Sequence, residues 1–274
     1  MKFNFLLINL KGEKGRLINA IDELYSIEQS DSIIRIEACD KKKAEAISYQ
    51  YISQKAEENI KNPICTGILP NYSAVGCAIS HIKCWRYILD NNLESGLIVE
   101  DDIKINDVKK FKNNLWNINI FINNHKDKNL FLVFNSRRVN NKNNYNYNDY
   151  NCSNDFNLKN NNFDKIKDMF IGTHFYYINR NMAKFLHEKI INMDYQIDLE
   201  IGKLAGQYFW DKTNLFINYN TNALTINNKF KTSIQFYVIS INELIEIFSI
   251  SEDIANCIYQ YIPYCFKKSR DNIM

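Results

Sequence analysis

The sequence has no long apolar run, no signal-peptide pattern in its first residues and no C-x-x-C pair, and each absence narrows the class of protein that we expect. No stretch approaches the roughly 18 apolar residues that a membrane-spanning helix needs. The apolar run within residues 1–9 is short and interrupted by asparagine, so we expect no signal peptide and a cytoplasmic location, in a host cell or virion if the source is viral. The seven cysteines are scattered without a C-x-x-C pair, which predicts neither a disulfide framework nor a zinc site but reduced, mostly buried thiols.

A large excess of one charge is also missing. The 34 Lys and Arg residues stand against 31 Asp and Glu, and the net charge of +3 is spread along the chain. Nucleic-acid-binding proteins usually carry a concentrated basic patch, so the composition disfavours that class and leaves room for a small anionic substrate. Apolar residues, in contrast, are plentiful: 46% of the 274 residues are hydrophobic and 14% are aromatic. This is enough to build a sizeable core in one large domain.

Strand-like and helix-like segments alternate along the first 239 residues. Short apolar runs rich in β-branched residues predict strands at 3–9, 32–38, 97–99, 130–134 and 170–179, and two or three more within 215–236. Apolar residues spaced three and four apart predict helices at 14–27, in part of 41–59, at 73–91 with Ser73 as the N-cap, and at 182–191. Such alternation is typical of an α/β domain with a largely parallel sheet, which binds ligands at the carboxyl ends of its strands.

Two segments do not follow this alternation. Residues 139–163 are about half asparagine and lack periodicity, so we predict a loop there. Residues 240–274 carry two short helical patterns around Ser249–Ser251 and are predicted to form a small helical appendage. The appendage faintly resembles a helix-hairpin-helix without its hairpin glycine, so nucleic-acid binding through this tail is the alternative.

Three consecutive acids, Glu100, Asp101 and Asp102, follow the predicted strand 97–99. Adjacent carboxylates repel one another unless a cation or hydrogen-bond donors compensate them. Hard divalent ions such as Mg²⁺ and Mn²⁺ prefer oxygen ligands and bridge carboxylates to substrate phosphates. The acids therefore suggest a metal site, with a solvated acidic turn as the alternative.

The residues before the acids provide a context for them. Residues 76–85 (GCAISHIKCW) and 97–102 (LIVEDD) together resemble the signature of the family 25 glycosyltransferases, which include lipooligosaccharide-biosynthesis and procollagen galactosyltransferase-like proteins. Further matching pieces follow in the family's order: 8–10 (INL) with Arg16, 37–40 (EACD), 172–178 (GTHFYYI) with Arg180 and Ala183, 195–198 (YQID) and 231–235 (KTSIQ). The resemblance runs from about residue 4 to residue 236. Tyr195 departs from it, because proline is common at that position.

This resemblance implies a fold and an activity. The fold would be GT-A-like, a Rossmann-type mixed sheet flanked by helices over residues 1–239, with 240–274 outside it. The activity would be metal-dependent, inverting transfer of a hexose, galactose or glucose, from a UDP-sugar to a hydroxyl of a glycan or a hydroxylysine-type protein acceptor, with Mn²⁺ or Mg²⁺ as the cofactor. The alternative is an inactive transferase-like module that binds glycan or protein.

The resemblance also implies which residues form the site. Asp102 takes the place of the D-x-D metal ligand, with Glu100 and His174 as further ligands. Asp198 is the candidate base, with Glu200 second. The candidate contacts of the nucleotide and diphosphate are Asn9, Arg16, Ser80, His81, Glu100 and Asp101.

Several of these residues also have a purely structural alternative. Asp198 could cap the helix that follows it, His81 could be a buried histidine that holds backbone groups, and Arg16 could be an ordinary surface residue. Trp85 and Trp210 are more typical of a core than of a sugar-binding platform.

Overall fold

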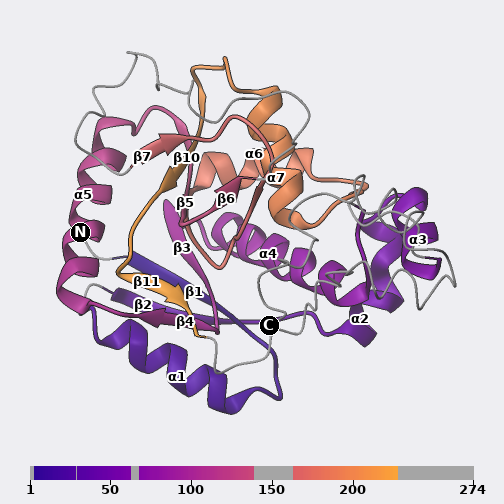
Figure 1. The fold of residues 1–274 in the computed structure, drawn as a ribbon, viewed down its shortest axis with the longest axis horizontal. Helices are drawn as coiled ribbons and strands as arrows, with labels where there is room; N and C mark the ends of the chain where they lie inside the picture. The colour runs from indigo at the N-terminus through magenta and orange to yellow at the C-terminus, as the bar shows by residue number, and fades with distance from the viewer. Residues whose placement is uncertain (1–2, 29, 63–67, 139–162, 228–274) are drawn as a thin grey trace, which may run out of the picture.

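The computed structural model describes residues 3–28, 30–62, 68–138 and 163–227, shown as coloured ribbon in Figure 1. Most of the predicted loop at 139–163 lies outside the described residues. The same holds for the motif at 231–235, the proposed domain boundary at 239 and the predicted appendage at 240–274.

Seven strands form one mixed sheet in the order β2-β1-β3-β9-β5-β10-β7. Their bounds are β1 Phe3–Asn9, β2 Ser30–Glu37, β3 Ser95–Glu100, β5 Asn129–Phe134, β7 Phe163–Lys165, β9 Phe175–Asn179 and β10 Asn214–Tyr219. The prediction of a mixed sheet flanked by helices is confirmed. As expected of a largely parallel sheet, β2, β1, β3, β5 and β10 run in one direction, whereas β9 runs antiparallel between β3 and β5, and β7 runs antiparallel to β10.

Two small ribbons flank the sheet. They pair β4 (Ile103–Ile105) with β11 (Leu224–Ile226), and β6 (Arg137–Arg138) with β8 (Phe170–Ile171). The single strand predicted at 170–179 is therefore two strands, β8 and β9. Gly172 separates them with a φ of +109°, a conformation that residues with a Cβ rarely adopt.

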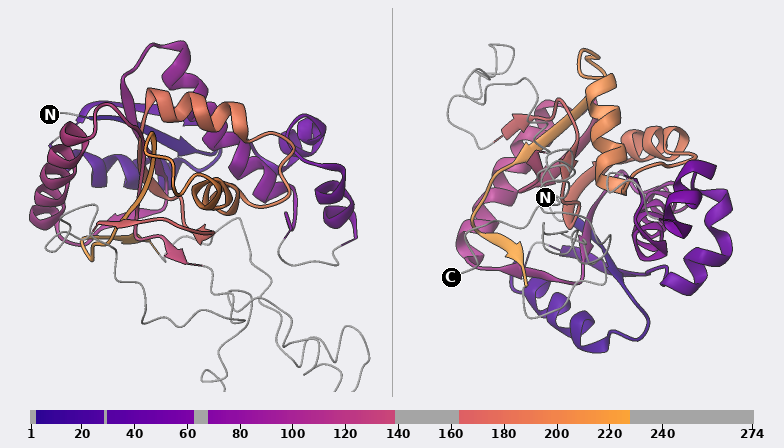
Figure 2. Two further views of the ribbon diagram at one scale, coloured as in Figure 1. Left: turned by 90° about the horizontal axis from the view of Figure 1, so that it is seen from above. Right: turned by 45° about the vertical axis from the view of Figure 1, so that its right-hand side comes forward.

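Helices cover both faces of the sheet, as Figures 1 and 2 show. Their bounds are α1 Lys14–Tyr25, α2 Lys41–Ile47, the 3₁₀ turn η1 Ser48–Gln50, α3 Gln54–Lys61, α4 Tyr72–Asp90, α5 Val108–Asn124, α6 Arg180–Lys189 and α7 Ile197–Gln207. Alternate strand residues face opposite layers. On β9, Tyr176 packs with the core of α2, α3, α4, α6 and α7, whereas Phe175 and Tyr177 pack with the core of α1 and α5. The sheet is thus the middle of three layers.

Helix α4 is the central helix of its layer. It begins at Tyr72, because the side chain of Asn71 accepts a hydrogen bond from Ala74 N (3.0 Å), so the prediction of Ser73 as the N-cap is wrong. Gly76 allows the close packing of α4 on the chain after β2, since a Cβ there would lie 2.4 Å from the carbonyl oxygen of Cys39. This packing places the next turns of α4 beside the ends of β1 and β3.

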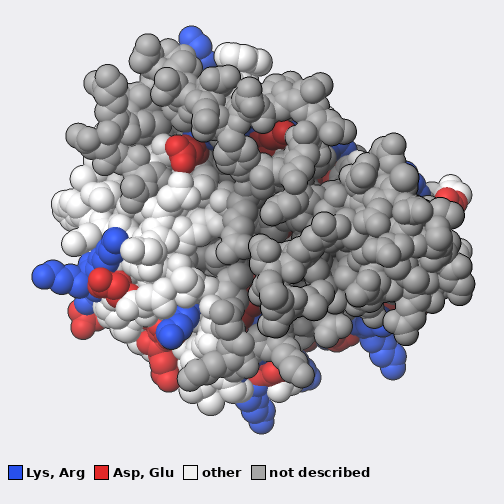
Figure 3. Space-filling view, in the orientation of Figure 1, with Lys and Arg blue, Asp and Glu red and all other residues white. Residues whose placement is uncertain are grey.

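Two predictions about the exterior can be checked on the described residues. Over the ranges that the structure describes, none of the helices is long and apolar enough to cross a membrane. Figure 3 shows basic and acidic side chains interspersed over the described part of the visible face.

The cysteines at 39, 77 and 84 are free thiols, and those at 39 and 84 are buried, as predicted.

Candidate active site

Two adjoining cavities open at the carboxyl ends of β1 and β3. The first, of about 230 Å³, is lined by residues of α1, α4, β3, the β8–β9 turn and α7. The second, of about 210 Å³, is lined by residues that follow β1 and β2 and by α4. Arg16, Cys77 and Glu100 line both cavities, so they stand at the boundary between the two. The cleft therefore lies where an α/β sheet is expected to bind its ligand.

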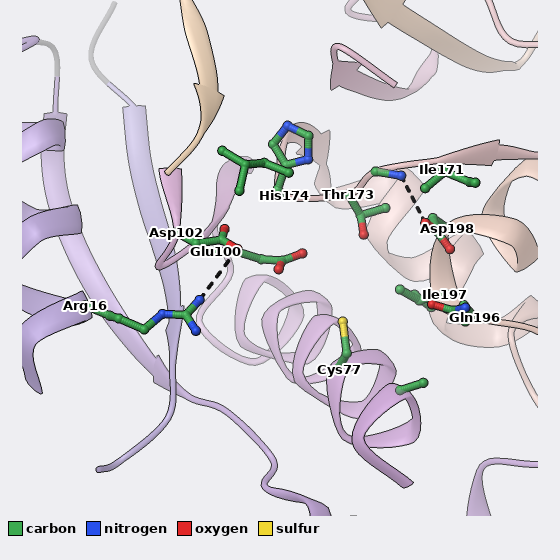
Figure 4. Close-up of a pocket in the computed structure, with 13 residues that line it drawn as sticks. Arg16, Cys77, Glu100, Asp102, Ile171, Thr173, His174, Gln196, Ile197 and Asp198 are labelled. Carbon is green, nitrogen blue, oxygen red and sulfur yellow. Dashed lines mark hydrogen bonds and ion pairs between the residues drawn. The ribbon is translucent and has the colours of Figure 1, made fainter. Parts of the chain in front are cut away.

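The first cavity has charged groups on opposite sides. Figure 4 shows Arg16 on one side and Asp198 on the other, with Glu100 and Asp102 between them and His174 nearby. Arg16 comes from α1 and Asp198 from the first turn of α7. Long-range packing thus gathers candidates that the sequence separates by more than 180 positions.

Asp101 points toward the second cavity and is fully paired. Asn9 Nδ2 donates to Asp101 Oδ2 (2.7 Å), and an Arg16 nitrogen lies 2.5 Å from Asp101 Oδ1. Arg35 Nε in turn donates to Asn9 Oδ1 (3.0 Å). Burial raises the pKa of Asp101, and the groups of Asn9 and Arg16 oppose that rise. This network joins the ends of β1, β2 and β3, and Arg16 is not an ordinary surface residue.

Asp102 has a different environment. Its Oδ2 lies 3.6 Å from Arg16, and its Oδ1 is buried without a hydrogen-bond partner among the described residues. Burial, followed by the charge of Glu100, raises the pKa of Asp102 to about 7. Asp101 and Asp102 are only 6% and 5% exposed, so the alternative of a solvated acidic turn is wrong.

Glu100 lies between the cavities and against α4. Its Oε1 is 3.4 Å from His81 Nε2, and its backbone N–H donates to the carbonyl of His174 (2.9 Å). Burial raises the pKa of Glu100, but His81, His174 and Arg16 together outweigh burial and hold it below its ordinary value. The ligand atoms of Cys77, His81 and Glu100 all lie within 4.8 Å of one another.

Asp198 is held by the turn between β8 and β9. Its Oδ2 accepts the backbone N–H of Gly172 (3.0 Å), and its Oδ1 accepts that of Leu199 (2.9 Å). The N-cap of α7 is Gln196, so the alternative in which Asp198 caps this helix is wrong. The carboxylate is buried, and burial raises its pKa despite these hydrogen bonds.

Glu200, the second candidate base, is engaged elsewhere. Its Oε1 accepts the backbone N–H groups of Asp194 (2.9 Å) and Tyr195 (3.0 Å), and its Oε2 lies 3.6 Å from Lys203. It lines neither of the two cavities, whereas His174 lines the first. These contacts hold the loop before α7.

Two candidates on α4 have polar partners within the protein. Ser80 lines the second cavity, but its hydroxyl accepts from Cys39 N (2.9 Å) and donates to the carbonyl of Gly76 (2.6 Å). His81 is 1% exposed, and its Nδ1 contacts the Tyr176 hydroxyl at 3.1 Å, so it contacts side chains and not the backbone groups of the structural alternative. Trp85 is buried as expected, whereas Trp210 is 87% exposed and the core expectation for it is wrong.

Other residues of the site were not predicted. Arg35 and Tyr176 contact candidate residues directly, and Thr173 and Gln196 line the first cavity. The only available signal was that three of them fall within matched motifs, Thr173 and Tyr176 in 172–178 and Gln196 in 195–198. Arg35 lies in an ordinary strand and carried no signal.

The sequence comparisons with known proteins agree with the motifs. Procollagen galactosyltransferase 2 of Homo sapiens and that of Mus musculus are each 29% identical over 98 residues, which are 36% of this chain but only 15% of either relative. A solved glycosyltransferase involved in the glycosylation of the major capsid of PBCV-1 matches 69% of this chain and 66% of its own, with 12% identity and a TM-score of 0.32. The model of glycosyltransferase family 25 (LPS biosynthesis protein) matches residues 2–201. Because that match spans most of the sequence, the chain belongs to glycosyltransferase family 25.

Proposed function

We propose that this chain is a metal-dependent, inverting glycosyltransferase. It transfers a hexose, galactose or glucose, from a UDP-sugar to a hydroxyl of a glycan or a hydroxylysine-type protein acceptor. The observation that carries the proposal is the convergence of Glu100, Asp102 and Asp198 on one cavity, although they come from distant parts of the chain. The names of the family and of its procollagen relatives support the two classes of acceptor.

The first cavity has suitable ligands for a divalent metal. Asp102 Oδ1 is buried and accepts no hydrogen bond among the described residues, which is costly unless a cation or another partner compensates it. Asp102, Glu100 and His174 would hold the ion, a set dominated by the oxygen donors that Mn²⁺ and Mg²⁺ prefer. When bound, the ion would act as a Lewis acid that neutralises negative charge on the departing diphosphate.

The second cavity is proposed to hold the nucleotide. Asn9, Ser80 and His81 line it, together with residues that follow β1 and β2. Arg16 lines both cavities, so its guanidinium can face a diphosphate that spans them. Its pairing with Asp101 fixes it in place before the donor binds. The sugar then enters the first cavity, between the metal-binding carboxylates and Asp198.

Asp198 is proposed to act as the base. The acceptor hydroxyl oxygen attacks the anomeric carbon while the bond from that carbon to the diphosphate breaks, and UDP leaves with the electron pair. Asp198 takes the hydroxyl proton, and attack on the face opposite the leaving group inverts the configuration. The backbone N–H groups of Gly172 and Leu199 hold the carboxylate in position. Glu200, which lines neither cavity, supports the loop before α7.

Release of UDP from a panel of UDP-sugars tests the proposal. The assay compares the wild type with Asp102→Ala, each with Mn²⁺ and with EDTA. We expect metal-dependent release from one donor by the wild type and almost none by the variant. Asp127→Ala is the control, because Asp127 is an exposed acid paired with Lys128. Equal release with EDTA, or by Asp102→Ala, contradicts the proposal, and silence of the folded wild type across the panel favours the binding-module alternative.

A further inference from the structure

Three buried polar side chains form a chain of contacts beneath the cleft. Trp85 Nε1 lies 3.0 Å from the Tyr176 hydroxyl oxygen, which lies 3.1 Å from His81 Nδ1. Trp85 and Tyr176 are fully buried and His81 is 1% exposed. Trp85 and His81 lie one turn apart on α4, while Tyr176 comes from β9. We refer to Trp85, Tyr176 and His81 as the buried triad.

The chemistry of the triad fixes the direction of its hydrogen bonds. An indole nitrogen can only donate, so the Tyr176 oxygen accepts from Trp85. The Tyr176 hydroxyl hydrogen then has His81 Nδ1 as its partner. Nδ1 must therefore be the unprotonated nitrogen, and a neutral His81 carries its hydrogen on Nε2. The opposite tautomer would aim two donors at Tyr176 and leave the buried hydroxyl hydrogen without a partner among the described residues.

The Nε2 hydrogen of His81 has one evident destination. Nε2 makes no hydrogen bond among the described residues, and the carboxylate oxygen Oε1 of Glu100 lies 3.4 Å from it. This distance is slightly beyond the usual range for N–H···O bonds, and such contacts often tighten when a ligand binds. The Glu100 side chain is 27% exposed, which leaves it room for the small rotation that would close the distance.

We propose that the buried triad acts as a positioning device, in which Trp85, Tyr176 and His81 direct an N–H group at Glu100 and so fix the carboxylate at the boundary between the two cavities. The consequence for donor and metal binding rests on the function proposed above. His81 then orients a metal ligand and is not itself one. Trp85 and Tyr176 become positioning residues although neither lines either of the two cavities described above.

The cluster of Cys77, His81 and Glu100 can be interpreted as a metal site or as an arrangement that orients Glu100. The ligand atoms of the three residues lie close enough together to suggest a metal site with a sulfur ligand. A metal on Nε2 would need the lone pair of that nitrogen, which the favoured tautomer uses to hold hydrogen. The triad therefore favours orientation of Glu100 over direct metal binding by His81.

The antiparallel strand β9 makes the triad possible. It lies between β3 and β5, where Tyr176 pairs with Ile98 on one side and with Val133 on the other. Ile98 is two residues before Glu100 on the same face of β3, so Tyr176 lies near the carboxylate but deeper in the layer. His81 bridges the remaining distance from α4.

The tautomer of His81 is the direct test. Nitrogen-15 NMR of the full chain with labelled histidine distinguishes Nδ1–H from Nε2–H. We expect the wild type to show the Nε2–H form and Tyr176→Phe to show a mixture of both. Tyr177→Phe is the matched control, because Tyr177 is equally aromatic, 3% exposed and on the opposite face of β9. An Nδ1–H form in the wild type overturns the proposal, and this measurement does not depend on the folding of a variant.

Metal affinity tests the consequence. Loss of a residue that orients a metal ligand typically weakens binding by about 10-fold to 100-fold, so Mn²⁺ titrations should show this loss for Tyr176→Phe and none for Tyr177→Phe. Equal Mn²⁺ affinity in the wild type and Tyr176→Phe overturns the positioning role. A thiolate-to-cobalt charge-transfer band in the wild type that is lost in His81→Gln overturns it as well, since it would make His81 a ligand. If the expected tautomer and Mn²⁺ results are obtained but no UDP-sugar is turned over, the triad stands and only the proposed transfer fails.

Discussion

Asp101 and Asp102 are neighbours in the sequence, yet they lie in opposite kinds of environment. On the side of the second cavity, Asp101 is paired on both oxygens, through Asn9 and Arg16. On the side of the first cavity, Asp102 keeps one buried oxygen unpaired among the described residues, and its pKa is raised to about 7 by burial and by the charge of Glu100. Asp198, across the same cavity, also has a raised pKa because it is buried.

Burial raises the pKa of Asp101 as well, so the two acids differ in their partners and not in the direction of the shift. For Asp101, the bonds from Asn9 and Arg16 offset part of the cost of burial and so support the folded state. Asp102 lacks such a partner on one buried oxygen among the described residues, and a buried carboxylate of this kind with a raised pKa reduces stability at neutral pH and is typical of functional sites. We therefore expect substitutions of Asp102 and Asp198, which line the first cavity, to reduce activity with little loss of stability. Substitution of Asn9, which lines the second cavity, should reduce stability more than turnover.

The largest effect on activity is expected for Asp102→Asn. The change keeps the size of the side chain but removes a charged ligand from the proposed metal site. Because such a metal contributes several kcal/mol of charge stabilisation, we expect turnover to fall by about 10³-fold or more. Steady-state UDP release at saturating Mn²⁺ measures the loss. Asp127→Asn should retain full activity, and turnover within tenfold of the wild type in Asp102→Asn would remove Asp102 from the proposed metal site.

Asp198→Asn should lower turnover by about 10²-fold to 10⁴-fold, the usual contribution of a general base. Burial raises the folded-state pKa of Asp198, so the wild-type rate should fall as pH drops through a value above the ordinary aspartate range. UDP release over a pH series measures both effects. A wild-type profile that stays flat through this range would contradict the role of Asp198 as base.

The same substitution should affect stability in the opposite direction. A carboxylate with a raised folded-state pKa stabilises the fold at low pH, and this contribution is lost as pH rises through the folded-state value. Asp198→Asn should therefore melt at a higher temperature than the wild type at pH 8, with a difference that shrinks on acidification. Thermal unfolding measured from pH 4, near the ordinary aspartate pKa, to pH 8 checks the sign of this stability difference. A variant that is less stable at pH 8 would show that the hydrogen bonds from Gly172 and Leu199 outweigh burial.

Asn9→Ala tests the second-cavity side. Asn9 is 1% exposed and bonds both Asp101 and Arg35, so its loss removes the donor to a buried Asp101 oxygen as well as the acceptor of Arg35 Nε. The expected cost is about 1–3 kcal/mol of unfolding free energy, with a higher KM for the donor and a smaller change in kcat. Urea unfolding and donor titrations measure these quantities.

A nearby asparagine provides the control for that experiment. Asn4, on the same strand, accepts a hydrogen bond from Ser32 Oγ (2.8 Å) away from the cavities, so Asn4→Ala should leave the KM unchanged. If Asn9→Ala lowers kcat as strongly as Asp102→Asn while the fold stays stable, the contrast between the two sides is wrong.

Much of the site could be predicted from the sequence because local patterns place it. The apolar run before Glu100 forms a buried strand that ends at Glu100. In α/β folds the ligand site lies at the carboxyl ends of the strands. The partners of the acids could not be predicted in this way. Arg35 reaches Asn9 across the β1–β2 pairing, and Tyr176 reaches His81 because β9 lies between β3 and β5, a strand order that no local periodicity reports.

The fold shows the same limit. No helix was predicted at α5, where exposed Trp116 and Ile120 interrupt the apolar stripe and buried Asn114 adds a polar residue to it. The Asn114 amide is satisfied by Thr221 and its carbonyl by Tyr219, partners more than 100 positions away. Helix propensity and periodicity predict a helix poorly where tertiary contacts decide which of its residues are buried.

The smallest effect is expected for Glu200→Gln, which separates the two candidate bases. Gln keeps the oxygen that accepts the N–H groups of Asp194 and Tyr195 and loses only the exposed-side ion pair with Lys203. We expect kcat within about threefold of the wild type and a stability loss of at most about 1 kcal/mol, as for a partly exposed ion pair. Glu188→Gln, an exposed substitution on α6, sets the baseline. A loss of 10²-fold or more with an intact fold would transfer the role of base from Asp198 to Glu200, because a residue that only supports the loop keeps its hydrogen bonds in the amide form.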